Sequence, residues 1–407
     1  MKMYIEKLTA KNIGAFDSLE VNFSPRNNII IGPNSSGKTS ILKLLCYCFS
    51  NTGFESIRFR KDVSFFSEFY FCDNKYTSGL KNGTDKDLLY RESNISRWEK
   101  VNEQNGFLPY EVSPMNLFAI GAYRYFEYMQ ISGMMREEKG EERLRYYKEN
   151  NINSLQKPSL PAIKQWMINR YFVIEKDWAE IEKNNWNILI DYLPKLVADD
   201  QSFKFLRIER DLEPIFEFNG KECYLEELSG GFKSVISIIF SIIDWCEGTN
   251  ENELGNIQNA QGTVLIDEID AHLHPQWQLK IISHLNNLFP NIQFIVTTHS
   301  PHIISNASAN EIIRIPNHNG IIKVSPNEKS YNYWEVSDIL QDLMGYDNLN
   351  SQNLNDILDK LDTSLENKNI KEYDTHLQEL KNILHSNDSI IKVYEIKKSK
   401  IFLNDQD

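Results

Sequence analysis

Residues 32–39 read Gly-Pro-Asn-Ser-Ser-Gly-Lys-Thr and fit the spacing G-x-x-x-x-G-K-[ST]. Glycines let such a loop wrap its backbone N–H groups around a phosphate, and the N-terminus of a following helix favours the phosphate charge. Lys38 would reach the β- and γ-phosphates of a nucleotide, and Thr39 would ligate Mg²⁺. An ordinary glycine turn is the alternative, but an apolar strand before the loop and a helix after it favour phosphate binding. The predicted nucleotide-binding residues of this loop are Asn34, Ser35, Ser36, Gly37, Lys38, Thr39 and Ser40.

A second candidate set lies at residues 263–270, Thr-Val-Leu-Ile-Asp-Glu-Ile-Asp. The apolar run predicts a buried strand that delivers Asp267 to its end, where the carboxylate can hold Mg²⁺ through water. Glu268, directly beside it, can polarise a water molecule that attacks the terminal phosphate. Two acids that merely end a strand are the alternative reading, and the glycine loop in the same chain favours the chemical one.

Residues 228–234, Leu-Ser-Gly-Gly-Phe-Lys-Ser, precede a predicted helix. Ser229, Gly230 and Gly231 would therefore sit at a helix N-terminus and form a second phosphate cradle, although a simple Ser-Gly-Gly turn would look the same. A cradle that cannot reach the nucleotide of its own chain can close over the nucleotide of a second copy.

His299 ends another apolar run, Gln-Phe-Ile-Val-Thr-Thr-His-Ser, 31 residues after Glu268. A lone histidine is more often structural than catalytic, so its role must be judged from the motifs around it. His272 and His274 suggest a metal pair by type, but no third ligand lies near them in the sequence.

The elements that must position these residues follow from hydrophobic periodicity. Residues 3–31 predict two or three strands, with Tyr4, Ile5, Leu8, Val21 and Phe23 as apolar positions. Residues 51–115 are polar and aromatic, without clear periodicity. The remaining expected elements are a helix over 40–49, a buried strand in 116–124, helices over 126–200, a hairpin in 213–228 turning at Asn219-Gly220, a buried helix after Gly231, two parallel-type strands in 263–270 and 293–300 separated by a helix, and a polar helical tail from about 334.

The order of loop, Ser-Gly-Gly cradle, Asp-Glu strand and histidine strand resembles the core of ABC-class ATPases, over roughly residues 1–50, 115–125 and 205–310. The segments "GPNSSGKTS", "LSGGFKS", "LIDEIDAHLHPQWQ" and "TTHSP" resemble the non-transporter branch, the RecF, Rad50 and overcoming-lysogenization-defect ATPases. "GAYR", residues 121–124, and the helical tail are similar to the ATPase subunits of Septu-type anti-phage systems and their retron-linked relatives.

This resemblance implies an α/β fold, an ABC-type P-loop NTPase head whose mixed sheet has flanking helices, with a helical insertion lobe and a helical C-terminal tail. The implied boundaries are 1–125 for the first half of the core, 126–204 for the lobe, 205–330 for the second half and 331–407 for the tail.

The resemblance also implies a mechanism. ATP and Mg²⁺ would lie in a head-to-tail dimer, between the loop of one subunit and Ser229, Gly230 and Gly231 of the other, and would be hydrolysed slowly. Thr39 and Asp267 would hold the metal, Glu268 and His299 would be catalytic, and Asp270 and His272 would reach across the dimer. A departure is the hinge glutamine of this class, for which Gln130 is the nearest candidate, and Phe232 stands where signatures often carry glutamine.

Composition limits the partners. The 407 residues carry a net charge of -13, which excludes a general nucleic-acid coat, although the basic runs 58–62 and 143–148 are candidate local patches or simply solvated faces. No apolar run approaches 20 residues and no signal peptide begins the chain, so we expect a cytoplasmic protein without a membrane partner. Five cysteines without a C-x-x-C pair indicate reduced thiols.

These features distinguish four candidate functions. The favoured one is an ATPase that controls a separately encoded HNH-type endonuclease in anti-phage defence, with any nucleic acid bound through that partner. The alternative is a RecF/Rad50-like DNA-repair ATPase acting on DNA ends or gaps, which would need long heptad arms that the 130–205 insert cannot supply. A Toprim nuclease does not fit the 108 residues after His299, and a transporter motor would lack this insert and tail.

Overall fold

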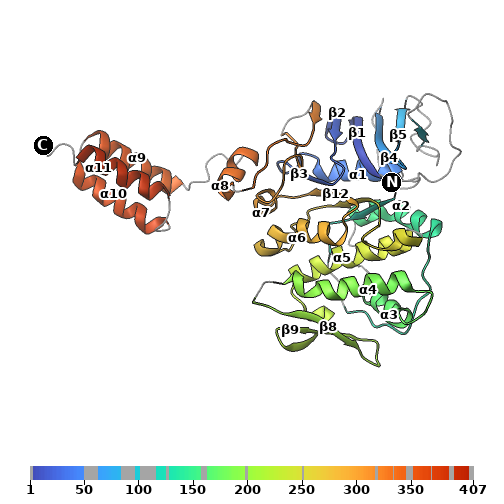
Figure 1. The fold of residues 1–407 in the computed structure, drawn as a ribbon. Coiled ribbons are helices and arrows are strands. Elements are labelled where there is room, and N and C mark those ends of the chain that lie inside the picture. The colour runs from blue at the N-terminus through green and yellow to red at the C-terminus, as the bar shows by residue number, and fades with distance from the viewer. Residues whose placement is uncertain are drawn as a thin grey trace. The chain divides into compact units, whose positions relative to one another are not determined.

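The computed structural model describes residues 3–49, 63–83, 97–100, 116–124, 128–156, 163–197, 200–249, 252–316, 320–332, 334–344, 352–367, 369–384 and 389–402. The chain divides into two compact units, Met1–Ile339 and Leu340–Asp407, which are taken one at a time (Figure 1). Among the helices of the described ranges, none has the length and hydropathy needed to cross a membrane.

A five-stranded parallel sheet carries the predicted motifs. Its order is β13 (Ile312–Arg314), β3 (Asn27–Ile31), β12 (Ile292–Thr297), β11 (Gly262–Ile266) and β7 (Leu117–Ile120). Every residue of β3, β11 and β12 is buried, as expected of strands covered on both faces. Because parallel strands end at one edge, the segments after β3, β12, β11 and β7 meet there, which is where open α/β sheets bind ligands.

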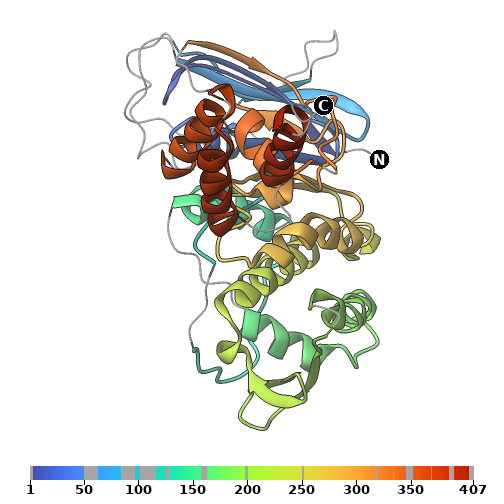
Figure 2. The same ribbon diagram turned by 90° about the vertical axis from the view of Figure 1, so that its left-hand side faces the viewer.

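A second sheet has the order β14 (Ile321–Val324), β2 (Phe16–Asn22), β1 (Tyr4–Ile13), β4 (Val63–Phe71), β5 (Asn74–Gly83) and β6 (Arg97–Lys100). Figure 2 shows its blue strands running beside the orange β14 along one end of the first unit. Helix α1 (Lys38–Phe49) packs against β4 and β5 of this sheet and against β7 and β12 of the parallel sheet. The motif helix is thus fixed between the two layers.

The sequence indicates no clear periodicity over residues 51–115, and this is wrong for residues 63–83. β4 and β5 form an antiparallel hairpin, in which Val63, Phe65 and Phe69 alternate with more exposed residues and join the core around α1. Aromatic side chains on both faces of β4 had concealed this period of two.

The helices and a small sheet make up the rest of the first unit. The small sheet has the order β10 (Lys221–Tyr224), β9 (Pro214–Phe218) and β8 (Phe203–Ile208), and the predicted hairpin is confirmed, with Asn219 and Gly220 in left-handed conformations. The helices here are α2 (Glu141–Gln156), α3 (Ile163–Val173), α4 (Glu180–Tyr192), η3 (Leu193–Leu196), η4 (Leu225–Glu227), α5 (Gly230–Thr249), η5 (Asn252–Gly255), α6 (Pro275–Leu288) and α7 (Pro301–Ile304). Figure 1 places α3, α4, α5 and α6 between the small sheet and the two large ones.

The helical tail that the sequence predicts is confirmed. It starts with α8 (Val336–Asp338) and the π-helix η6 (Ile339–Leu343), and the second unit holds α9 (Gln352–Glu366), α10 (Ile370–Ile383) and α11 (Ser389–Phe402). These three helices share a small apolar core that contains Leu361, Tyr373 and Leu380.

Two predictions made from composition have different outcomes. All five cysteines are free, and Cys46, Cys48 and Cys246 are buried, which raises the pKa of each thiol and keeps it unreactive. The basic run 58–62 lies outside the described residues. The run 143–148 does not form a basic face, because Arg143 pairs with Asp244 and Lys148 is buried.

Candidate active site

The loop between β3 and α1 has the backbone geometry that the glycine spacing predicts. Gly37 has a φ of +94°, and a Cβ there would lie 2.3 Å from the ring of Phe16, so only glycine fits. A Cβ on Gly32 would lie 2.7 Å from the carbonyl oxygen of Ile315. Asn34 and Ser35 are exposed, and Ser36 is buried with a hydroxyl that has no hydrogen-bond partner among the described residues. The loop therefore offers polar groups that are still available to a phosphate.

Lys38 lies inside this loop. Its ammonium donates to the carbonyl oxygens of Gly32 at 2.9 Å and Pro33 at 3.0 Å, and the residue is only 7% exposed. Burial lowers the pKa of Lys38, while the negative charges of Asp267, Glu268 and Asp270 oppose that shift. The carboxylates at the strand ends thus help to keep Lys38 protonated at the position where it would contact a phosphate.

A chain of hydrogen bonds joins the loop to the acid strand. The Thr39 hydroxyl donates to both carboxylate oxygens of Asp267, at 3.0 and 2.9 Å. Thr297, at the end of β12, donates its hydroxyl to Asp267 at 2.6 Å and accepts the backbone N–H of Glu268 at 2.7 Å. A hydroxyl and a carboxylate in contact at a phosphate loop form a hard-oxygen ligand pair, which fits Mg²⁺.

Glu268 adopts a strained conformation at the end of β11. Its side chain is exposed, and its backbone has a φ of +45°, which is unusual for a glutamate. Arg124, just after β7, holds this turn by donating to the carbonyl oxygens of Asp267 at 2.8 Å, Glu268 at 2.6 Å and Gly121 at 3.1 Å. The carboxylate therefore projects from a backbone that is fixed on both sides.

His299 is placed beside this turn through Asp270. The Asp270 carboxylate accepts the hydroxyl of Thr298 at 2.5 Å and the backbone N–H of His299 at 3.3 Å. Burial and the positive charge of Lys38 lower the pKa of His299, against the effect of the three nearby carboxylates. The imidazole is therefore neutral at physiological pH, able to donate from one ring nitrogen and to accept at the other.

The proximity of these charges gives a pH prediction. Because burial and the Lys38 charge both disfavour imidazolium, His299 should titrate below its ordinary pKa of 6.5. Lys38→Ala removes the second cause and should move that titration to higher pH. NMR titration of the ring protons would measure both values, with His299→Gln to assign the signal. Lys204→Ala, on β8, is the control and should leave the midpoint unchanged; an equal shift in both lysine variants would contradict the assignment.

The Ser-Gly-Gly cradle opens helix α5 as predicted. Ser229 is exposed, and its hydroxyl accepts the backbone N–H of Phe232 at 3.4 Å. A Cβ on Gly231 would lie 2.6 Å from the carbonyl oxygen of His272 and 2.8 Å from the ring of Trp277. A Cβ on Gly230 would meet no atom of the described residues within 4 Å. Packing within the chain thus requires glycine at 231 but leaves the space beside Gly230 open.

The structure brings the loop residues, Asp267, Glu268 and His299 to one sheet edge. Gln130 is exposed, and the described structure shows no hydrogen bond between its side chain and this edge. His274 caps helix α6, accepting from the N–H of Gln276 at 3.4 Å. Sequence reasoning missed the contacts of Arg124 and Thr297, although "GAYR" and "TTHS" had been singled out as resembling motifs.

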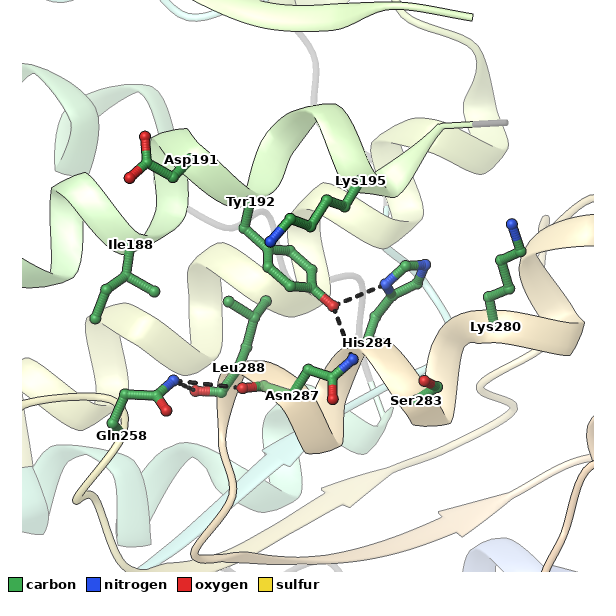
Figure 3. A pocket seen from close by; sticks show the side chains of 10 residues that line it. All are labelled: Ile188, Asp191, Tyr192, Lys195, Gln258, Lys280, Ser283, His284, Asn287 and Leu288. Atoms are coloured by element: carbon green, nitrogen blue, oxygen red, sulfur yellow. Dashed lines mark hydrogen bonds between the residues drawn. The ribbon is translucent and has the colours of Figure 1, made fainter. Parts of the chain in front are cut away.

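A separate hollow of about 680 Å³ lies between α4–η3 and α6 (Figure 3). Its lining includes Lys195, Lys280 and Tyr192, whose hydroxyl is 3.0 Å from His284 Nδ1. None of the loop, acid-strand or cradle residues lines it, so it is not part of the candidate nucleotide site.

The chain is similar to a known family and to several known proteins. The RecF/RecN/SMC N terminal domain family matches residues 4–323. Septu protein PtuA of Bacillus thuringiensis is 29% identical over 407 residues, covering 97% of this chain and 98% of the relative. The probable ATPase of retron Vc95 from Vibrio cholerae is 35% identical over 144 residues, 32% of this chain and 28% of its own length. The SMC head domain from Thermotoga maritima aligns with a TM-score of 0.44 at 15% identity, covering 81% of this chain and 100% of that one.

The family match spans most of the chain and includes the phosphate loop, the cradle, the acid strand and the histidine strand. It confirms the predicted fold class and the resemblance drawn from the motifs. The chain belongs to the RecF/RecN/SMC N terminal domain family and is an ABC-class ATPase.

Proposed function

We propose that this ATPase binds and slowly hydrolyses ATP–Mg²⁺ in a head-to-tail dimer and controls a separately encoded nuclease in anti-phage defence. The observation that carries the ATP–Mg²⁺ part is the hydrogen-bond chain from Thr39 through Asp267 and Thr297 to the backbone of Glu268. It links the element that would grip the phosphates to the element that would activate water.

Each side chain has a defined task in this proposal. Lys38 transfers its two hydrogen bonds from the loop carbonyls to the β- and γ-phosphate oxygens, and Thr39 and Asp267 hold Mg²⁺, which neutralises phosphate charge when bound. Glu268 accepts a hydrogen bond from the attacking water, and neutral His299 donates one to the γ-phosphate. Because both side chains project from fixed strand ends, little reorganisation is needed during the reaction.

The dimeric arrangement is supported by the cradle. Ser229 and Gly230 are exposed at the N-terminus of a 20-residue helix, which favours an anion. The open space beside Gly230 gives no reason for glycine within one subunit, and close approach of a second subunit's nucleotide would supply that reason. We propose that Asp270 and His272 take part in the same interface.

The proposed nuclease partner is supported by the relatives of this chain. The described residues hold no group of three or more His, Cys, Asp or Glu side chains able to bind a metal ion. Septu protein PtuA aligns over nearly its whole length with this chain. The resemblance of the motifs to Septu-type systems implies an HNH endonuclease subunit. The DNA-repair alternative shares the fold, but nothing in the described structure favours it over the proposed function.

Nuclease dependence on a partner can be tested directly. The purified chain with ATP and Mg²⁺ or Mn²⁺ should leave supercoiled, linear and single-stranded DNA, and RNA, intact. Adding an HNH protein encoded beside it should produce cleavage that depends on the nucleotide state. Robust metal-dependent cleavage by the chain alone, unaffected by the HNH protein, would contradict the proposed division of labour.

Nucleotide binding is tested with Lys38→Ala. Loss of a buried cation facing phosphate should weaken ATP binding by about 3 kcal/mol, roughly a hundredfold, in calorimetry. The melting temperature of the nucleotide-free protein should change little, because the burial of the ammonium offsets its two hydrogen bonds. Lys204→Ala serves as the control, and unchanged ATP affinity in Lys38→Ala would refute the loop assignment.

A further inference from the structure

Ser234 connects the cradle helix to the turn that carries Glu268. It lies on α5, five residues after Ser229, and is fully buried. Its hydroxyl oxygen accepts a hydrogen bond from Nε of Arg124 at 3.1 Å and donates one to the carbonyl oxygen of Ala271 at 3.3 Å. One side chain of the helix therefore contacts both an arginine beside Glu268 and the segment that follows Glu268.

Arg124 holds the two peptide groups that flank Glu268. Its Nη1 donates to the carbonyl oxygen of Asp267 and its Nη2 to that of Glu268, at 2.8 and 2.6 Å. These carbonyls belong to the peptide units before and after the Glu268 Cα, so their positions determine the φ and ψ of Glu268. The left-handed φ of +45° is unfavourable for glutamate and persists only where neighbours hold it.

The chemistry of Arg124 suits this task. It is 3% exposed, and burial lowers its pKa to about 10, so it stays charged at neutral pH. In the described structure its hydrogen bonds go to neutral oxygens, while the negative charges of Asp270, Asp267 and Glu268 partly oppose the effect of burial on its pKa. A planar guanidinium can serve several oxygens in fixed directions, which an ammonium cannot do.

We propose that Arg124 and Ser234 are positioning residues that couple the place of helix α5 to the conformation of Glu268. The inference rests on the proposed function, in which Glu268 activates water and Ser229 engages the nucleotide of a second subunit. A helix moves as a rigid element, so engagement at Ser229 displaces or fixes Ser234, and Arg124 carries that change to the two peptide groups around Glu268. Hydrolysis is thereby made dependent on closure, without either residue touching ATP.

The test compares two serines of the same helix. Ser237 is one turn after Ser234, is 2% exposed, and its hydroxyl has no hydrogen-bond partner in the described structure. Ser234→Ala should lower kcat by about ten- to a hundredfold, and Ser237→Ala should stay within about twofold of wild type. ATP affinity by calorimetry and ATP-dependent dimerisation by light scattering should stay close to wild type in both, since the phosphate loop and Ser229 are intact.

Two further variants separate positioning from packing. Arg124→Lys keeps the positive charge but loses the planar guanidinium, and it should lower kcat to a similar degree. The double variant Arg124→Lys/Ser234→Ala should lower kcat little further, because both residues act through the same contact with Glu268. Ser234→Thr keeps the hydroxyl and should recover most of the rate. Equal kcat in Ser234→Ala and Ser237→Ala would overturn the coupling.

Glu268→Gln, measured alongside, distinguishes the two possible failures. If Glu268→Gln is inactive while Ser234→Ala matches Ser237→Ala, the coupling is wrong and the catalytic assignment stands. If Glu268→Gln turns over ATP at the wild-type rate, the catalytic assignment is wrong, and the coupling, which acts through Glu268, is wrong with it.

Discussion

Glu268→Gln should lower steady-state ATP hydrolysis by about a hundred- to ten-thousandfold, the range expected when a general base is lost. The amide keeps the shape of the side chain and its hydrogen bonding, but it cannot polarise water. Because the Glu268 side chain is exposed and its backbone is held by Arg124 and Thr297, the fold and the nucleotide loop should be unaffected. ATP should therefore bind as before, and the variant should accumulate as a closed dimer that size-exclusion chromatography with ATP detects.

The control for this experiment is Glu328→Gln, another exposed glutamate of the first unit that lies outside the four segments at the sheet edge. It should match wild type in both turnover and dimer fraction. Wild-type turnover in Glu268→Gln would show that another group activates the water. Loss of turnover without more dimer than wild type would show that ATP binding alone does not drive closure.

Much of the parallel sheet and its motifs could be predicted because local sequence encodes them. The β-branched apolar runs before Gly32 and Asp267 favour buried strands on their own, and the glycine loop indicates the start of the helix that follows. Parallel strands bring their carboxyl ends to one edge, and the resemblance to ABC-class ATPases had already implied that Lys38, Asp267 and His299 act on one nucleotide. The elements needed only short-range patterns, whereas the roles of the site residues needed the family resemblance.

Other features depended on tertiary packing and left no such signal. Arg124 meets Ser234 across 110 positions of the chain, and its other hydrogen bonds go to backbone carbonyls, which every residue type offers equally. The need for glycine at position 37 arises partly from the ring of Phe16, which lies 21 residues earlier on β2. The hairpin of β4 and β5 was missed because aromatic residues on both faces of β4 conceal which face is buried.

The cradle is proposed to contact the nucleotide of a second subunit, so its test must compare dimers with monomers. Ser229 is exposed at the start of α5, and the hydrogen bond that its hydroxyl makes among the described residues is long, 3.4 Å from the N–H of Phe232. Ser229→Arg should therefore fold and should leave ATP binding by the monomer largely intact, because residues 32–39 hold the nucleotide. The large cation would occupy the space that the second subunit's phosphate needs, so closure and turnover should be lost. Ser399→Arg, at an exposed serine of the separate second unit, is the control and should be fully active.

Mixing Ser229→Arg with Lys38→Ala makes the prediction decisive. A mixed dimer has one composite site with both defects and one with neither, since the intact loop of the first variant meets the intact cradle of the second. Random pairing makes about half of the dimers mixed, so two inactive proteins should recover roughly a quarter of wild-type hydrolysis when one intact site suffices. Two copies of the same variant can never form such a site, so the recovery cannot come from either protein alone.

If Ser229→Arg instead abolishes ATP binding by the isolated monomer, the cradle acts within its own chain and the sandwich dimer is wrong. If the monomer binds ATP normally but mixing restores no hydrolysis, both sites of a dimer must be intact for either to hydrolyse ATP. A covalently linked wild-type and Ser229→Arg pair should then be inactive as well.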